Sequence, residues 1–233
     1  MEANVESRRQ VAGPIHTIGL LLIIAGWACL GVLSVAMRRA HTSPHLIISY
    51  SLAAILELLT LAYVLLGVCR QGGSLRGLIG GAWTRGKDFW RDVLIAAGFW
   101  IASLVCLGVL GLALHVRGPA DAVHLLAPKG AVQILFWILM SCTAGFCEEV
   151  IFRGYLQRQF IAMSSNAPIG IVLSAEVFAA AHLYQGGKRA FLIGVFGAMF
   201  GILAYFRRSL RPGIMAHAWQ DSILGLLIRF VPK

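Results

Sequence analysis

Six ionisable residues of this sequence lie inside apolar stretches or at their ends. They are Glu148, Glu149, Arg153, His182, His217 and Asp221. An ionisable group within a membrane segment is costly, so it is first interpreted as functional, with a partner of its own. Carboxylates and imidazoles gathered in one place can carry out general acid–base catalysis or hold a metal ion. These six residues are therefore the candidate site.

The first motif combines two neighbouring carboxylates with one arginine. On a helix, Glu149 and Arg153 are i,i+4 neighbours and can form an ion pair. Glu148 is turned about 100° away around the same helix and can face another partner. Arg153 would then neutralise one carboxylate and leave the other for chemistry. The alternative is a charged helix end whose salt bridge lies among the lipid headgroups.

The histidines belong to two later motifs. His182 shares a helix face with Phe178, and alone it is typical of a hydrogen bond between helices. His217 and Asp221 are i,i+4 neighbours, so they also share a face. Both could contact a metal or a water, or Asp221 could orient His217. The alternative for this pair is a polar contact between helices.

A tight turn flanked by Pro168 predicts an antiparallel helix pair in which the first two motifs lie at the same height along the helix axes. Glu148 and His182 are equally far from Ser165 in sequence, so they can face each other in an antiparallel helix pair. His217 reaches this level only if the helix pair projects beyond the membrane. A polar run after the first motif favours such a projection. It consists of Arg153, Gln157, Arg158 and Gln159.

Two mechanisms of amide hydrolysis fit this combination. In one, Glu148 is a general base that deprotonates a water held by His182. In the other, Glu148, His182 and His217 hold a divalent metal such as zinc, whose bound water is the nucleophile. In either case His217 could stabilise the oxyanion. Glu57 and Glu176 are two further carboxylates inside apolar stretches and are candidates for a functional role.

The composition predicts the elements that position these residues. Hydrophobic residues make up 58% of the 233 residues and charged residues only 13%, whereas an ordinary soluble domain has roughly 25% charged residues. Apolar stretches long enough to cross a bilayer recur, so we expect an all-α fold, a polytopic transmembrane helix bundle of about seven spans. The expected spans are 18–37, 46–68, 93–114, 131–163, 167–184, 190–206 and 213–230.

We expect a single integrated membrane domain in two parts. Residues 1–130 supply three helices and a basic connection at 69–92, which is either an interfacial segment or a plain loop. Residues 131–233 form the catalytic helix bundle. The first span lacks a small-residue cleavage site and is interpreted as a retained helix. Gly197 and Gly201 form a GxxxG motif, which we interpret as helix packing.

The net charge of +10 points to a membrane partner. The basic residues lie almost wholly in short loops and nucleic-acid motifs are absent, so we expect contact with the lipid bilayer and no nucleic acid. The N-terminal side, which includes Arg8 and Arg9, carries more of them. This bias predicts a multi-pass protein of the inner membrane with its N-terminus and active site toward the cytoplasm. The five cysteines form no CxxC and indicate neither a disulfide framework nor a thiolate metal site.

The three motifs together resemble the signature of the CPBP family of intramembrane proteases, which comprises CAAX proteases and bacteriocin-processing enzymes and is also called Abi. The matching residues are Glu148-Glu149-xxx-Arg153, Phe178-xxx-His182 and His217-xxx-Asp221, with flanks at 152–156 and 210–213. The resemblance covers roughly residues 131–230. Other intramembrane proteases are excluded because the sequence has no HExxH, GxSG or GxGD motif.

The resemblance implies an intramembrane endopeptidase whose substrate is a membrane-anchored peptide or protein. Carried over by position, Glu148 would activate the water together with His182, and Glu149 would pair with Arg153. The third motif would form the oxyanion site or supply further ligands. The family is named a metalloprotease family, yet a glutamate mechanism without metal has also been argued for its members, so both remain open.

The third motif departs from the family pattern at Asp221, where CAAX-cleaving members typically have Asn. An Asn side chain can donate a hydrogen bond to an oxyanion, whereas an ionised Asp cannot. Asp221 is therefore protonated, binds a metal, or only orients His217. Two other functions stay as alternatives: a non-catalytic membrane scaffold or bacteriocin-immunity protein, and a small transporter, which the lack of inverted repeats disfavours.

Overall fold

The computed structural model describes residues 10–41, 45–116 and 121–230, and every regular element in these ranges is a helix. The predicted all-α membrane bundle is confirmed at this level. Arg8 and Arg9, which enter the argument on orientation, lie outside the described residues.

Within the described ranges, five helices are long and apolar enough to cross a bilayer. They are α2 (Pro14–Arg39), α3 (Leu46–Arg70), α5 (Gly86–Ala113), the continuous helix Ala131–Ser164, and α10 (Gly187–Arg207). Two shorter helices, α9 (Ala167–Ala181) and α11 (Arg211–Leu227), occupy the fifth and seventh predicted spans. The helix bounds agree with the predicted spans to within a few residues at most ends. The count of seven membrane crossings stays a prediction.

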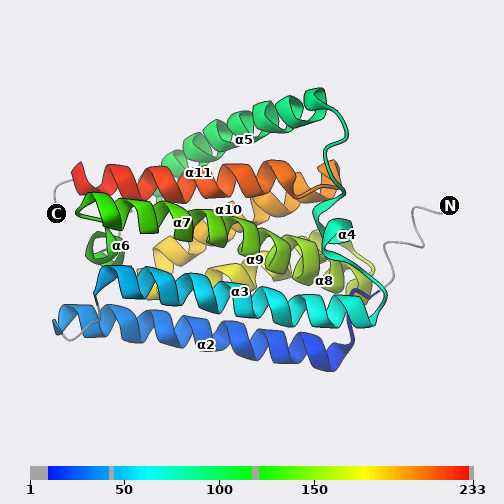
Figure 1. Ribbon diagram of the computed structural model, residues 1–233, viewed down its shortest axis with the longest axis horizontal. Coiled ribbons are helices and arrows are strands. Elements are labelled where there is room, and N and C mark those ends of the chain that lie inside the picture. Colours follow the sequence, from blue (N-terminus) through cyan, green and yellow to red (C-terminus); the bar gives the residue numbers. More distant parts are fainter. Residues whose placement is uncertain (1–9, 42–44, 117–120, 231–233) are drawn as a thin grey trace.

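The helices form two layers (Figure 1). In the front layer the order is α5, α11, α7 (Ala131–Glu148), α3 and α2, and neighbours in this order pack against each other. Behind them lie α9 and α10, which pack on each other, and α9 also packs on α8 (Gln157–Ser164). A short helix, α6 (Asp121–Leu126), covers one end, near α2.

The helix that carries the first motif is continuous, as predicted, but its centre is not an α-helix. Between α7 and α8 lies the π-helix η1, Glu149–Leu156, in which the hydrogen bonds run from i to i+5. All eight of its residues are buried. Short π-helical segments are rare and occur frequently at functional sites. The sequence did not indicate this change of helix type.

The predicted reversal between the first two motifs is present. Ser165 has a positive φ of 53° and ends α8. The Asn166 side chain caps α9 by accepting a hydrogen bond from the backbone N–H of Ile169 (3.1 Å). Helix α9 ends at Ala181, and the 3₁₀ turn η2 (Leu183–Gln185) follows. His182 therefore lies just beyond the helix, whereas the fifth span was predicted to run to residue 184.

The polar run after the first motif turns inward. Gln157 donates a hydrogen bond to the Gly201 carbonyl (3.0 Å), and Arg158 donates to the Leu78 carbonyl (2.7 Å). The Gln159 side chain holds the start of α2 through the backbone N–H and carbonyl of Ala12. These contacts explain the run by internal hydrogen bonding, so it no longer supports a projection of the helix pair beyond the membrane.

The basic connection at 69–92 is a structured segment. It contains the short helix α4 (Leu75–Ile79), which the Ser74 hydroxyl caps. Its end is held by the fully buried Asp92, which accepts from the indole N–H of Trp83 (2.9 Å) and pairs with Arg211 (2.9 Å) and Arg207 (3.4 Å). The ion pair with Arg211 therefore attaches the connection to the first turn of α11. Because the connection also contains a capped helix, the plain-loop alternative is wrong.

Small residues allow α7 and α11 to approach closely. A Cβ atom at Gly145 of α7 would lie 2.7 Å from the backbone nitrogen of Ala218 in α11. On α10, the GxxxG glycines make room for side chains: a Cβ at Gly197 would lie 3.0 Å from the Phe178 ring, and one at Gly201 would lie 2.6 Å from Oε1 of Gln157. The motif serves packing, as expected, and it also exposes two carbonyls to hydrogen-bond donors.

The close approach of α7 and α11 can be tested with Gly145→Ala. The added methyl group would push against α11 backbone, and such overpacking typically costs about 1–3 kcal/mol. We expect a lower melting temperature in detergent. Gly98→Ala in α5 is the matched control, because a Cβ there meets nothing within 4 Å. Equal melting of both variants would contradict this helix contact.

Candidate active site

The centre of the site is a buried ion pair between Glu149 and Arg153. Nη1 of Arg153 donates to Oε1 of Glu149 at 2.8 Å, and both side chains are almost completely buried. The predicted i,i+4 pair is thus present. The same Oε1 atom lies 3.0 Å from Nδ1 of His217. Oε1 of Glu149 therefore connects the first motif with the third by contacting both Arg153 and His217.

Arg153 is further held by groups from two other helices. Its Nη2 atom donates to the Gly197 carbonyl of α10 at 3.1 Å. Its guanidinium lies over the ring of Phe178 (4.5 Å to the centroid) and near that of Phe200 (5.1 Å). A buried charge is tolerated only when paired and hydrogen-bonded, and aromatic faces add a further attraction. These contacts position η1, α9, α10 and α11 relative to one another.

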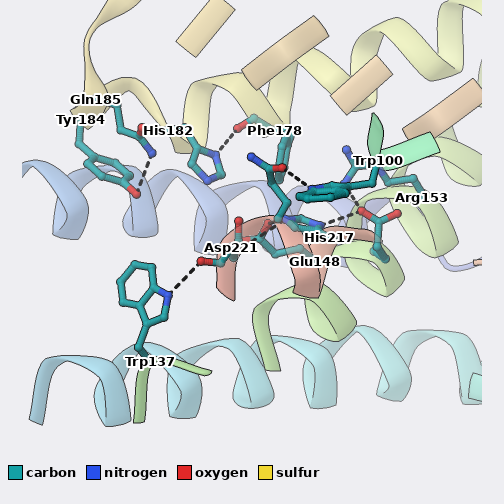
Figure 2. A network of polar contacts seen from close by, with 12 residues as sticks. Trp100, Trp137, Glu148, Arg153, Phe178, His182, Tyr184, Gln185, His217 and Asp221 are labelled. Atoms are coloured by element: carbon teal, nitrogen blue, oxygen red, sulfur yellow. Dashed lines mark hydrogen bonds and ion pairs between the residues drawn. The ribbon is translucent and has the colours of Figure 1, made fainter. Parts of the chain in front are cut away.

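His217 lies between carboxylates on both sides of its ring (Figure 2). Because a carboxylate accepts, Nδ1 donates its proton to Glu149. Nε2 lies 3.5 Å from Oε2 of Glu148 and 3.7 Å from Oδ2 of Asp221. Both distances are within ion-pair range for a protonated ring, but they exceed the usual length of a hydrogen bond.

The two neighbouring glutamates lie in different surroundings. Glu149 is fully buried, whereas Glu148 is 8% exposed and the Asp221 side chain is 32% exposed. A Cβ at Gly213 would lie 3.1 Å from Oε2 of Glu149, so this glycine leaves room for the inner carboxylate. Glu148 and Asp221 are therefore less buried than Glu149.

His182 joins the cluster through Phe178. Nδ1 of His182 lies 2.8 Å from the Phe178 carbonyl, which can only accept, so Nδ1 carries the proton. In the neutral ring, Nε2 is then an acceptor. The Phe178 ring lies 4.7 Å from the His182 ring and 6.1 Å from the His217 ring, measured between centroids, and His182 interacts electrostatically with Asp221. All three motifs therefore meet at one place.

Of the two further candidate carboxylates, Glu57 lies in the cluster and Glu176 lies outside it. Glu57 of α3 extends into the cluster, where it interacts electrostatically with Glu148 and Asp221. Glu176 lies exposed on α9 and is not part of the cluster. Only the intramembrane position of Glu57 could have indicated its role.

Three other polar residues that sequence reasoning missed support the third motif. The Trp137 indole N–H donates to the Asp221 backbone carbonyl at 2.9 Å (Figure 2). The Trp100 indole N–H donates to Oε1 of Gln220 at 2.7 Å. These contacts attach α7 and α5 to the part of α11 that carries Asp221. Nothing in the sequence pairs these residues, because they are far apart along the chain.

A metal ion does not fit this arrangement of side chains. Within residues 10–41, 45–116 and 121–230, no group of three or more His, Cys, Asp or Glu is placed to hold one. The predicted ligands Glu148, His182 and His217 are part of the cluster, but they do not converge as a ligand set. No step is therefore derived through a metal, and the metal site stays a prediction.

The buried ion pair can be tested with Arg153→Met. Removing one partner of a buried pair leaves an uncompensated charge and costs about 3–5 kcal/mol. We expect a matching fall in the free energy of unfolding, measured by denaturation in detergent. Arg91→Met is the control: its side chain is 53% exposed and pairs with Asp88 at 3.6 Å, so the expected loss is below about 1 kcal/mol. Similar losses would show that Arg153 is not a buried anchor.

Comparison with known proteins supports the interpretation of these motifs. Residues 130–223 match the model of the Rce1-like family, described as type II CAAX prenyl endopeptidase Rce1-like. The matched range contains all six residues of the candidate site. No curated protein and no solved structure matches the chain. Over residues 130–223 the chain is therefore similar to the Rce1-like family of type II CAAX prenyl endopeptidases, and the resemblance to the CPBP family is confirmed.

Proposed function

We propose that this protein is an intramembrane endopeptidase that hydrolyses a peptide bond of a membrane-anchored peptide or protein, with Glu148 as its general base. The family match over residues 130–223 supports the class of reaction. The placement of Glu148 carries the assignment of the base. It is the less buried carboxylate of the first motif, whereas Glu149 is fully buried and bound to Arg153 and His217.

The reaction would begin with a water between Glu148 and His182. Glu148 removes a proton from the water while the water oxygen attacks the carbonyl carbon of the substrate. Nε2 of neutral His182 accepts a hydrogen bond from the same water and orients it. The proton on Glu148 then passes to the nitrogen of the leaving amine as the C–N bond breaks. Glu148 thus acts first as a base and then as an acid.

His217 would stabilise the negative charge that develops on the substrate oxygen. In its protonated form it donates from Nδ1 to Glu149, and its Nε2–H is within ion-pair distance of Glu148 and Asp221 but forms no close hydrogen bond with either. A donor held in this way acts where charge develops in the transition state. Asp221 lies 3.7 Å from that nitrogen and would orient the ring.

The substrate and the orientation follow from the membrane setting. A peptide whose anchor lies in the bilayer would reach the site from the membrane or from one of its faces. We propose a multi-pass protein of the inner membrane with the site toward the cytoplasm, because the basic residues favour the N-terminal side. A non-catalytic scaffold or immunity protein is the second candidate, and it predicts a phenotype that survives loss of Glu148.

The base is tested by Glu148→Gln, which keeps the shape of the side chain and removes its basicity. We expect turnover of quenched, lipid-anchored peptides to fall by at least about 10³-fold, because general base catalysis contributes 10²–10⁴-fold, with unchanged melting. Glu176→Gln is the matched control, since Glu176 is an exposed carboxylate of α9 in the same apolar setting. Equal cleavage by wild type and Glu148→Gln would refute the assignment.

The mechanism without metal makes a separate prediction. We expect the wild type to retain its activity after treatment with 1,10-phenanthroline followed by gel filtration, because the cluster as arranged offers no three-ligand site among the described residues. Loss of activity that zinc restores would instead support Glu148, His182 and His217 as ligands.

A further inference from the structure

Tyr184 is a side chain of the site that the mechanism has not yet used. It lies in the 3₁₀ turn η2, two residues after His182. Its ring is stacked near the His182 ring, with centroids 6.0 Å apart and planes at 30°. On the other side it packs over Gly31 of α2, where a Cβ would lie 2.8 Å from Cδ1 of Tyr184. The ring is therefore fixed between α2 and the second motif.

The Tyr184 hydroxyl is available as a donor. It accepts a hydrogen bond from Nε2 of Gln185 at 3.2 Å, so its own proton is free for another acceptor. Burial raises the pKa of Tyr184 to about 12, which keeps this proton in place at neutral pH. The group interacts electrostatically with Glu148, Asp221 and Glu57. Figure 2 shows the hydroxyl end turned toward the side of the cluster on which Asp221 lies.

A neutral donor is what the rest of the cluster lacks. The carboxylates of Glu148 and Asp221 accept hydrogen bonds when ionised and cannot donate to an oxyanion. Neutral His182 has its proton on Nδ1, where it is used by the Phe178 carbonyl. His217 supplies one donor, and sites that stabilise an oxyanion commonly combine more than one.

We propose that Tyr184 is a catalytic residue whose hydroxyl donates a hydrogen bond to the carbonyl oxygen of the scissile peptide bond as negative charge develops there. It acts together with His217 of α11, from the turn η2 that follows the second motif. This inference rests on the proposed peptidase function. In this proposal the Tyr184 hydroxyl of η2 is the oxyanion donor, because an ionised Asp221 cannot donate a hydrogen bond.

The first test is Tyr184→Phe, which retains the ring packed on Gly31 and near His182 and removes only the hydroxyl. Loss of one oxyanion donor lowers kcat by about 10²–10³-fold, so we expect a fall of that size with KM within about twofold of wild type. Tyr205→Phe, which alters an exposed tyrosine of α10, is the control and should match wild type. Unchanged kcat in Tyr184→Phe would overturn the proposal.

A substrate with a thioamide at the scissile bond separates transition-state contact from a structural role. Sulfur is a weak acceptor, so this substrate gains little from the hydroxyl, and the ratio of wild-type to Tyr184→Phe rates should shrink at least about tenfold. A ratio equal to that for the normal amide would mean that Tyr184 acts only through structure, and it would overturn the proposal even if kcat falls.

The outcomes also separate this proposal from the proposed function. Cleavage by wild type that is lost in Glu148→Gln but kept in Tyr184→Phe would refute the role of Tyr184 alone. Equal cleavage by wild type and Glu148→Gln, or no cleavage by wild type of any membrane-anchored peptide, would refute the peptidase and the donor together.

Discussion

The structure depends on one buried contact, in which Arg153, Glu149 and His217 meet. Taking these groups out of water costs several kcal/mol for each charge, and the cost is offset only if the donors and acceptors match closely. Arg153 satisfies this condition with a carboxylate, a carbonyl of α10 and two aromatic faces. Because the partners come from η1, α9, α10 and α11, the contact sets the register of four helices at once.

The same contact divides the work between two adjacent glutamates. Glu149 is held on Oε1 by both Arg153 and His217 and is fully buried, so it serves as an anchor. Glu148, one residue earlier, lies 3.5 Å from the outer nitrogen of His217 and is slightly less buried. A carboxylate without a close hydrogen-bonded ion pair keeps more of the basicity that general base catalysis requires. Glu149 thereby fixes the position of the neighbouring Glu148, while Glu149 and not Glu148 forms the close contacts with Arg153 and His217.

Small residues make this arrangement sterically possible. Gly145 brings α7 against the backbone of α11, Gly213 leaves room for the inner carboxylate, and Gly197 offers its carbonyl to Arg153. In an apolar bundle, helices are held by close packing and by such hydrogen bonds, since lipid and side chains are equally apolar. The π-helix η1 lies at the centre of this packing, and all eight of its residues are buried.

Much of the fold could be predicted because it is local. Apolar length and turn residues located the helices, and the i,i+4 rule paired Glu149 with Arg153 and His217 with Asp221. The family pattern then brought the three motifs into one site. The inward turn of Gln157 and Gln159 and the burial of Asp92 could not be predicted, since their partners lie far away in the chain.

Glu57 and Glu176 show where the sequence stops being informative. Each is a single carboxylate in an apolar helix, and composition and periodicity treat them alike. In the folded chain, Glu57 extends into the cluster beside Glu148, while Glu176 lies on an exposed face. Helical periodicity states which residues share a face, but which face turns inward depends on how distant helices pack. The sequence by itself therefore determined the helices and their motifs, and only the tertiary structure decided which carboxylates form the site.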